Sequence, residues 1–336
     1  MPPFAVVMLC PAGFEDVVAM AARSELPKFA EQSRSGGLVQ GQTVASIRQL
    51  RGFSCATNVF QVLHRVPRST VENELRQVLI DLPGAARPIG MPMRGTFRLR
   101  IHNDGQFEST SDALARRLEL HLASWTGLFA SRRAGGLEIW LIRRTREAES
   151  ILAAKLTAGV QRRAPGVLRP EICAALARVE PLRGRELVLD PFAGSGAIGQ
   201  ACVDAGAQQV WLNDVRSGAR ARPASARIVW TARDFRSIGA TPGSVSAVVT
   251  DPPWGHYPAG DQDVDRLYTD LGAAAASWLE PGGAVVLLTG THDGNVEHFL
   301  RAGELACELD LAVLVNGHKA RVLRARKAKA PYGISI

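Results

Sequence analysis

The feature that most constrains the fold is a regular alternation of short apolar strands with helical segments in the second half of the chain. Strands are expected at residues 187–190, 210–213, 228–231, 245–250 and 284–289. Near-continuous apolar strands of this kind are buried on both faces, and intervening helices provide the cover. The pattern therefore predicts a doubly wound α/β domain with a parallel sheet. Asn316-Gly317 lies between strands expected at 309–315 and 320–326, which indicates an antiparallel hairpin at its end.

Acidic residues stand at the carboxyl ends of four successive strands of this predicted sheet. They are Asp190, Asp214, Asp234 and Asp251. An open α/β sheet binds its ligands outside the carboxyl ends of its strands. The four acids are therefore expected to line one ligand site.

A glycine-rich loop follows the first of these strands and leads into a helix. It reads Asp190-Pro191-Phe192-Ala193-Gly194-Ser195-Gly196-Ala197-Ile198-Gly199. The glycines loosely fit a dinucleotide fingerprint, so an NAD enzyme is a rival interpretation. Asp190, however, would place a like charge against a diphosphate and suits a ligand bearing an ammonium, such as the methionine part of S-adenosylmethionine. The glycines let the backbone approach such a ligand closely, which needs no phosphate.

The fourth strand runs into Asp251-Pro252-Pro253-Trp254, which combines a carboxylate, two prolines and an aromatic ring. The prolines fix the backbone and keep carbonyl groups out of helical pairing. The carboxylate and a carbonyl can accept hydrogen bonds from an NH2 group, and Trp254 can stack on the base that carries it. The ordinary alternatives are a simple Asp-Pro-Pro turn and a core tryptophan.

Two other acids are assigned to the nucleoside part of such a ligand. Asp214 could accept hydrogen bonds from both ribose hydroxyls, or serve as a helix cap or solvated turn acid. Asp234 is placed to accept from an adenine amine with Phe235 beside the ring, although an aspartate in a turn is unremarkable. No metal is required by this set of residues.

On these motifs, residues 170 to 330 resemble a class I S-adenosylmethionine-dependent methyltransferase. The resemblance implies a Rossmann-like, seven-stranded, doubly wound sheet with an antiparallel C-terminal hairpin. It makes the Asp190 loop the cofactor loop and Asp251-Pro252-Pro253-Trp254 the amino-methyltransferase motif. S-adenosylmethionine is the cofactor that the resemblance implies.

The amino half resembles the ferredoxin-like plus THUMP arrangement that precedes such domains in RNA guanine methyltransferases. Pro11-Ala12-Gly13-Phe14-Glu15 matches the opening, and the segments at 97–100 and 137–140 match the THUMP core. The implied domains are ferredoxin-like (1–70), THUMP-like (71–150), a basic linker (151–169) and methyltransferase (170–336). The implied activity is methylation of the exocyclic N2 amine of guanine in tRNA or ribosomal RNA, with tRNA favoured.

The pattern of the amino half predicts a mixture of helices and strands. Helices are expected at 15–26, 52–58, 71–82 and 111–125, and strands at 4–10, 37–39, 44–47, 59–64, 97–102 and 137–142, with a Pro- and Gly-rich connector at 83–92.

The charge of the chain is concentrated in this half. Residues 1 to 180 hold 24 Lys and Arg against 16 Asp and Glu, whereas residues 181 to 336 hold 16 of each. A basic module attached to a neutral one is typical of a polyanion ligand such as RNA, with compositional bias as the alternative. The expected phosphate contacts are Arg132, Arg133, Arg143, Arg144 and Arg146. A second basic patch is expected at Lys319, Arg321, Arg324, Arg326, Lys327 and Lys329.

One stretch departs from the family pattern. Only 13 residues, Val215 to Arg227, lie between Asp214 and the third strand, too few for the usual full helix. Two further functions stay open beside a guanine methyltransferase, the first because the same tetrapeptide serves adenine and the second because of this short segment. One is an adenine-amine methyltransferase acting on RNA or DNA, and the other is an RNA-binding protein with a vestigial fold.

Composition excludes several other classes. No apolar run approaches the roughly 20 residues that span a bilayer, and the first residues do not resemble a signal peptide. The five cysteines are scattered and form no Cys-x-x-Cys pair, which argues against a disulfide framework and a zinc site. We expect a cytoplasmic protein with core thiols and without metal or membrane partners.

Overall fold

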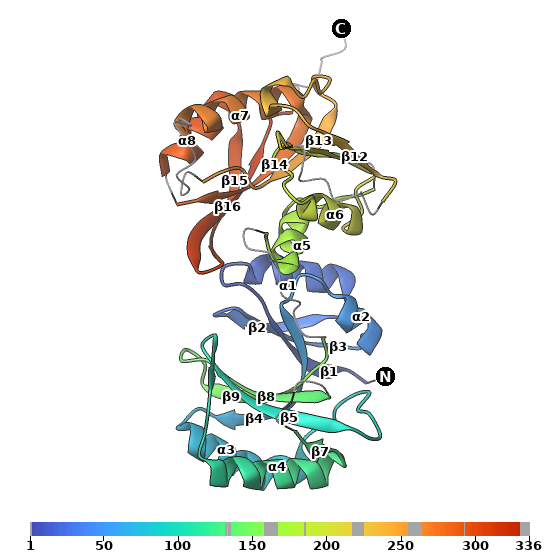
Figure 1. Ribbon diagram of the computed structural model, residues 1–336, viewed down its shortest axis with the longest axis vertical. Helices are drawn as coiled ribbons and strands as arrows, with labels where there is room; N and C mark the ends of the chain where they lie inside the picture. Colours follow the sequence, from blue (N-terminus) through green and yellow to red (C-terminus); the bar gives the residue numbers. More distant parts are fainter. Residues whose placement is uncertain are drawn as a thin grey trace. The chain divides into compact units, whose positions relative to one another are not determined.

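The computed structural model describes residues 2–131, 133, 136–157, 167–184, 186–216, 225–254, 264–291 and 293–329. The chain forms two compact units, Met1–Gln161 and Arg162–Ile336 (Figure 1). Each unit has its own sheet. Among the described residues, no helix is both long and apolar enough to cross a membrane.

The first unit is built on a nine-stranded sheet of order β2-β3-β1-β4-β9-β8-β5-β6, with β7 also paired to β5. Its elements are β1 (Phe4–Leu9), α1 (Glu15–Glu25), β2 (Ala30–Ser35), β3 (Leu38–Thr43), α2 (Ile47–Gly52), β4 (Asn58–Pro67), α3 (Val71–Asp81), η1 (Leu82–Gly84), β5 (Thr96–Asn103), β6 (Gln106–Glu108), α4 (Asp112–Thr126), β7 (Phe129–Ala130), β8 (Leu137–Arg143) and β9 (Glu149–Lys155).

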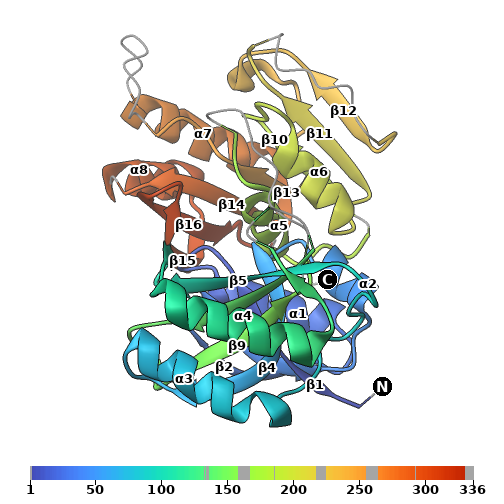
Figure 2. The same ribbon diagram turned by 60° about the horizontal axis from the view of Figure 1, so that its bottom comes forward.

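Helices α3 and α4 lie side by side against one face of this sheet (Figure 2). Their apolar residues recur at helical spacing, as in Leu114, Leu118 and Leu122 of α4, and join a core that includes Phe97 and Ile139 of the sheet. Alternate residues of the same strands form a second core on the opposite face, around Phe60 and Trp140. The sheet of the first unit is thus buried on both faces over much of its area.

Two expected elements of this unit are wrong. The strand expected at 44–47 and the helix at 52–58 are replaced by one helix, α2, which begins earlier. Ser46 caps it by accepting a hydrogen bond from the Gln49 backbone, while the Gln49 side chain accepts from the Ser46 backbone. This capping box fixes the start of α2 before the predicted position.

The domain boundaries expected inside the first unit are also wrong. Residues 151–155 were expected in a linker, but they belong to β9, which pairs with both β4 and β8. Because β9 joins strands from before and after residue 70, the sheet crosses both expected boundaries. The part of the predicted linker at 158–166 lies outside the described residues.

The second unit confirms the predicted α/β fold. Its seven-stranded sheet has the order β12-β11-β10-β13-β14-β16-β15, parallel except for β16, which is antiparallel to both neighbours. The elements are α5 (Pro170–Val179), β10 (Leu187–Asp190), α6 (Ala197–Asp204), β11 (Gln209–Asn213), β12 (Ile228–Thr231), η3 (Phe235–Ser237), β13 (Val245–Thr250), α7 (Val264–Trp278), β14 (Leu279–Gly290), α8 (Asp293–Gly303), β15 (Ala306–Val315) and β16 (His318–Arg326).

The central strands β10, β13 and β14 of this sheet are buried from both sides, as their apolar runs predicted, whereas the edge strand β15 is largely exposed. Val248 of β13 packs into a core with Leu271 and Phe299 of α7 and α8, and its neighbours Ala247 and Val249 are buried as well. Four of the five cysteines are buried thiols, and Cys307 is exposed. At their carboxyl ends, β10 and β13 carry the polar side chains of Asp190 and Thr250.

Candidate active site

The chain changes direction in the sheet between β10 and β13. From β10 it runs outward through β11 and β12, then returns to place β13 on the other side of β10. Such a switch point opens a crevice at the carboxyl ends of the two central strands, where open α/β sheets bind ligands. Asp190 is the last residue of β10, and Asp251 directly follows β13.

Asp190 is fully buried at this switch point. Its Oδ1 accepts hydrogen bonds from Thr250 Oγ1 at 2.8 Å and from the Phe192 amide at 3.1 Å. Its Oδ2 is buried and has no hydrogen-bond partner among the described residues. Burial raises the pKa of Asp190 to about 7, the two hydrogen bonds oppose the rise, and the charges of Asp251 and Asp214 add to it. A cationic donor at Oδ2 would satisfy this carboxylate.

The glycine loop is held open beside Asp190. Gly194 has a φ of +51° and Gly196 a φ of +80°, a region that side chains rarely adopt. A Cβ on Gly194 would meet nothing within 4 Å, so the space beside it is free for a ligand. The Ala193 amide donates to the Asn213 carbonyl at 2.9 Å, and the Gly194 amide donates to Asp214 Oδ2 at 2.9 Å.

Asp214 therefore organises the loop in addition to its expected role. Its second oxygen, Oδ1, accepts from the Arg216 amide at 2.8 Å, and the side chain is half-buried. Each carboxylate oxygen can accept more than one hydrogen bond, so this arrangement leaves capacity for ribose hydroxyls.

The structure places Asp234 and Phe235 in different surroundings. Asp234 is exposed, caps η3 by accepting from the Arg236 amide, and pairs with the Arg236 guanidinium at 3.3 Å. Phe235 is buried and packs against Phe192 with ring centroids 5.1 Å apart. Asp234 is thus exposed but bonded to Arg236, whereas Phe235 and Phe192 support the loop from the core.

Asp251 and Trp254 are joined directly. Trp254 Nε1 donates a hydrogen bond to Asp251 Oδ1 at 2.8 Å. Burial raises the pKa of Asp251 to about 7, and the hydrogen bond from Trp254 opposes that rise. Pro252 is buried and Pro253 exposed, so the turn is anchored on one side and open on the other. Residues 255–263, which follow the turn, lie outside the described residues.

Three polar residues that the sequence did not single out support this site. Thr250 holds Asp190, and its only signal was its place before Asp251. Buried Asn213 links three strand ends, because its side chain bonds the Pro191 carbonyl and the Thr231 hydroxyl. Tyr268 of α7 shares a 2.6 Å hydrogen bond with Thr289 of β14, and both are buried. Burial raises the pKa of Tyr268, and the charge of Asp251 adds to the rise.

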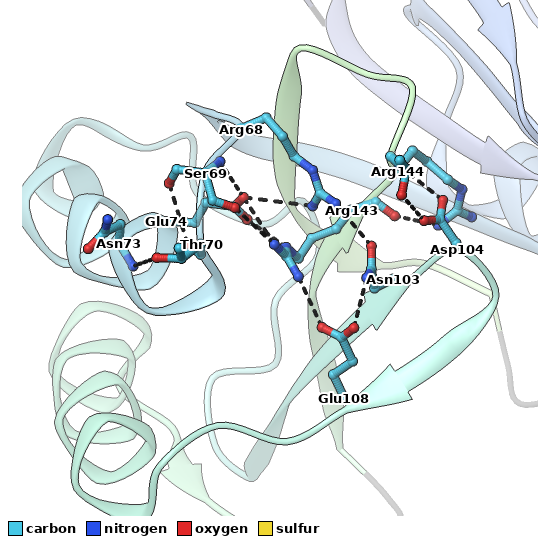
Figure 3. A network of polar contacts seen from close by, with 11 residues as sticks. Arg68, Ser69, Thr70, Asn73, Glu74, Asn103, Asp104, Glu108, Arg143 and Arg144 are labelled. Atoms are coloured by element: carbon cyan, nitrogen blue, oxygen red, sulfur yellow. Dashed lines mark hydrogen bonds and ion pairs between the residues drawn. The ribbon is translucent and has the colours of Figure 1, made fainter.

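The expectation that Arg143 and Arg144 contact phosphate is wrong, because both are buried inside the first unit. Figure 3 shows the Arg143 guanidinium bonded to Glu74 at 2.8 Å and to Glu108 at 3.0 Å. Arg144 donates to the Gly36 and Arg143 carbonyls. The guanidiniums of Arg143 and Arg144 are therefore hydrogen-bonded within the first unit.

The remaining arginines of that prediction differ in their position. Arg133 and Arg146 are exposed, and Arg132 lies outside the described residues.

The second basic patch is largely neutralised, which corrects the expectation for its arginines. Arg321 pairs with Asp310, and Arg324 and Arg326 pair with Glu308. Lys327 donates to two backbone carbonyls. In the described part of the chain, no group of three or more His, Cys, Asp or Glu side chains could hold a metal ion.

The chain is similar to known methyltransferases. Residues 200–319 match the family model described as UPF0020, RMKL-like methyltransferase domain. The tRNA (guanine(6)-N2)-methyltransferase of Thermus thermophilus is 30% identical over 212 residues. These cover 58% of this chain and 62% of that relative, so the chain spans less than two thirds of the relative's length.

Solved structures with the same fold cover nearly the whole chain. TrmN from Thermus thermophilus has a TM-score of 0.77 and 22% identity, covering 96% of this chain and 99% of its own. A possible methylase from Clostridium difficile 630 has a TM-score of 0.71 and 14% identity, covering 99% and 100%. A "predicted N6-adenine-specific DNA methylase" from Listeria monocytogenes has a TM-score of 0.67 and 14% identity, covering 98% and 97%. Residues 200–319 are therefore similar to an RMKL-like methyltransferase domain, and the chain shares the fold of these solved structures.

Proposed function

We propose that the protein transfers a methyl group from S-adenosylmethionine to the exocyclic N2 amine of a guanine in tRNA. The observation that carries this proposal is the meeting of Asp190 and the Asp251 turn at the switch point of the sheet. The fold alone does not choose the acceptor. The choice of guanine and of tRNA over ribosomal RNA is supported by the 30% identity to a tRNA (guanine(6)-N2)-methyltransferase.

The residues around Asp190 fit this cofactor. Asp190 Oδ2, which has no hydrogen-bond partner among the described residues, would accept a hydrogen bond from the ammonium of the cofactor's methionine part. The open space at Gly194 would let the cofactor lie close to the loop backbone. Asp214 would hold the ribose, with the exposed Asp234 on the adenine side. When bound, S-adenosylmethionine supplies a methyl group activated by the positive sulfur.

The Asp251 turn is suited to an amine that is a poor nucleophile. The lone pair of an exocyclic guanine amine is delocalised into the ring. Hydrogen bonds from its N–H groups to the Asp251 carboxylate and the Pro252 carbonyl would orient the nitrogen and offset the positive charge that develops on it. Holding the reacting atoms in line contributes up to about 7–11 kcal/mol in well-oriented systems. Trp254 would stack on the flipped base, and Arg133 and Arg146 would contact phosphate.

The test is the variant Asp251→Ala, assayed for transfer of a labelled methyl group to tRNA transcripts. We expect the rate to fall by roughly 100-fold or more. Calorimetry should show S-adenosylmethionine binding within about twofold of the wild type, since Asp190 and the glycine loop are untouched. Asp265→Ala, which removes an exposed carboxylate from α7, is the matched control. A normal rate in Asp251→Ala would refute the assigned role.

A second candidate function is methylation of an adenine amine, because the same acceptors can hold either base. A Listeria monocytogenes protein of the same fold carries such a name. Mass spectrometry of nucleosides from methylated RNA separates the two, since one product is N2-methylguanosine and the other N6-methyladenosine.

A third candidate is an RNA-binding protein with a vestigial methyltransferase fold, which the short Val215 to Arg227 segment favours. Residues 217–224 of that segment lie outside the described residues. Absence of S-adenosylmethionine binding at millimolar ligand would support this alternative over both enzymes.

A further inference from the structure

The edge of the large sheet in the first unit carries two exposed aromatic rings. Phe129 is 78% exposed and Phe107 is 48% exposed. They come from β7 and β6, two short strands that both pair with β5. Strand β8 occupies the other side of β5, so β6 and β7 lie along the same outer edge.

These rings share one face of the sheet with two arginines of β5. Thr96 pairs with Phe129 and His102 pairs with Phe107, and residues directly opposite in neighbouring strands share a face. Because side chains alternate along a strand, Arg98 and Arg100 lie on that face as well. Phe97 and Ile101 lie on the other face of the sheet, where they join the core beneath α4. Phe129, Arg98, Arg100 and Phe107 therefore form a row, here named the edge row. The seven residues from Thr96 to His102 span roughly 20 Å.

The Phe107 end of the edge row is a supported stacking surface. The Arg100 guanidinium lies over the Phe107 ring at 3.4 Å from its centroid. The same ring meets Trp140 edge-on at 5.0 Å and His102 at 5.3 Å. Phe107 is thus held by neighbouring rings while about half of it stays open to solvent.

The two arginines of the edge row are not held in ion pairs within the described part of the protein. In the described part of the chain, no salt bridge joins Arg98 or Arg100 to a carboxylate. Glu138 lies opposite Arg98 on the same face. Its carboxylate accepts a hydrogen bond from Trp140 Nε1 at 3.0 Å and forms a salt bridge with Lys155 at 3.5 Å. Burial lowers the pKa of Arg100, the charge of Arg98 lowers it further, and Glu138 opposes both. An anionic partner would stabilise this pair of arginines.

We propose that the edge row binds unpaired nucleotides of the RNA substrate, with phosphates on Arg98 and Arg100 and bases stacked on Phe107 and Phe129. Alternating cations and exposed rings are how proteins hold single strands, because each base presents a flat face and each phosphate a charge. A duplex hides its base faces within the stack and cannot use the rings. The inference rests on the proposed function for the identity of the polyanion as RNA. It goes beyond that function by placing the contact and by specifying unpaired nucleotides.

The test measures binding of the full-length protein to a fluorescent 12-nucleotide single-stranded oligo(U) and to a blunt 12-base-pair RNA duplex. The variant Arg98→Gln/Phe129→Ala removes one charge and one ring from the edge row. Arg76→Gln/Ile80→Ala is the matched control, since it removes one charge and one exposed apolar side chain from α3, on the opposite face of the sheet. Phe129, Arg76 and Ile80 are exposed and Arg98 is half-buried, and thermal unfolding checks that both variants fold.

We expect the edge-row variant to bind oligo(U) about tenfold or more weakly, with little change for the duplex and for the control variant. Phe129→Ala alone should leave the salt dependence unchanged, whereas Arg98→Gln alone should reduce its slope by about 0.7. Equal losses in the control variant, or unchanged oligo(U) binding in the edge-row variant, would overturn the proposal. A change in oligomeric state by light scattering without a change in RNA binding would also overturn it, by making the edge a protein interface.

Failure of this inference is distinguishable from failure of the proposed function. The binding assay needs no methyl transfer, so it can succeed in a protein that methylates nothing. Conversely, if the edge-row variant methylates tRNA with an unchanged KM for RNA, the inference fails and the proposed function stands.

Discussion

At the scale of single residues, Asp190 links the stability of the second unit to its ligand. A buried carboxyl group with a pKa of about 7 keeps its proton in the folded state up to that pH, whereas the unfolded chain releases it near pH 4. The folded state therefore binds more protons between these values, and stability falls as pH rises through this window. Above pH 7 the cost of the buried charge is fully present.

The variant Asp190→Asn is expected to remove part of this cost. At pH 8 it should stabilise the ligand-free second unit by on the order of 2 kcal/mol, and at pH 4 it should have little effect. It should also weaken S-adenosylmethionine binding, because the ammonium loses its partner. Thermal unfolding and calorimetry at the two pH values check both parts. Because the pKa of Asp251 is also raised to about 7, the stability of the variant should still depend on pH to some extent. Equal stabilisation at both pH values would contradict the assignment.

The indole N–H of Trp254 offers a second test at this scale. Trp254→Phe keeps an aromatic ring but removes the donor to Asp251 Oδ1. That hydrogen bond lowers the pKa of Asp251, so its loss should raise the pKa and shift the acid limb of the methylation rate profile to higher pH. At pH 7 we expect a rate loss of roughly tenfold with nearly unchanged cofactor affinity.

Trp211→Phe is the matched control for this substitution. It removes an indole N–H that donates to Thr231 Oγ1, at a partly buried position in the same unit. A pH profile that shifts equally in Trp211→Phe, or not at all in Trp254→Phe, would rule out the role of the hydrogen bond.

At the scale of elements, the buried pair of Glu74 and Arg143 fixes helix α3 to the end of β8. Glu74 Oε1 also accepts from the Ser69 amide, and Arg143 donates to the Ser69 carbonyl (Figure 3). The pair therefore ties the start of α3 to a strand that is distant in sequence. Two charges buried together in this way leave a large cost when one partner is removed.

Arg143→Gln should therefore act on stability. We expect a loss of about 3–5 kcal/mol in the free energy of unfolding, measured by urea denaturation, because Glu74 would lose its main buried partner. Arg146→Gln, at an exposed position nearby, should change stability by less than about 0.5 kcal/mol. Adding Glu74→Gln to Arg143→Gln should recover part of the loss. If Arg143→Gln and Arg146→Gln lose equal amounts of stability, the pair of Glu74 and Arg143 is not what holds α3.

At the scale of the whole molecule, the two units have separate cores. Buried residues of β13, β14, α7 and α8 form one, and those of α3, α4, β5 and β8 belong to another. A ligand that binds only the second unit should therefore stabilise only that unit. At about 100 times its dissociation constant, S-adenosylmethionine should add roughly 2.7 kcal/mol.

Hydrogen exchange read by mass spectrometry can check this selectivity. Protection should rise in the segments of β10 and α6 and stay unchanged in α3 and α4. Asp190→Asn, with its weakened cofactor binding, should show a smaller rise at the same ligand concentration. Equal protection of both units would show that they respond as one body.

The sequence by itself determined the second unit well. Apolar strands need cover on both faces, so the alternation at 187–289 specified the parallel sheet, and the acids at its strand ends specified where a ligand meets it. Strand β10 begins and ends at the predicted residues, because the apolar run before Asp190 is a strong local signal.

Only the tertiary structure decided which polar groups were free. Arg143 and Arg146 are three residues apart and look alike in sequence, yet one is buried on Glu74 and the other is exposed. Pairing between β9 and β4, which are distant in sequence, likewise removed the predicted domain boundaries. The edge row needed the register of β6 and β7 against β5 to bring Phe107 and Phe129 beside Arg98 and Arg100. Local periodicity reports which residues are buried along one element, whereas the partner of a charge depends on contacts between elements.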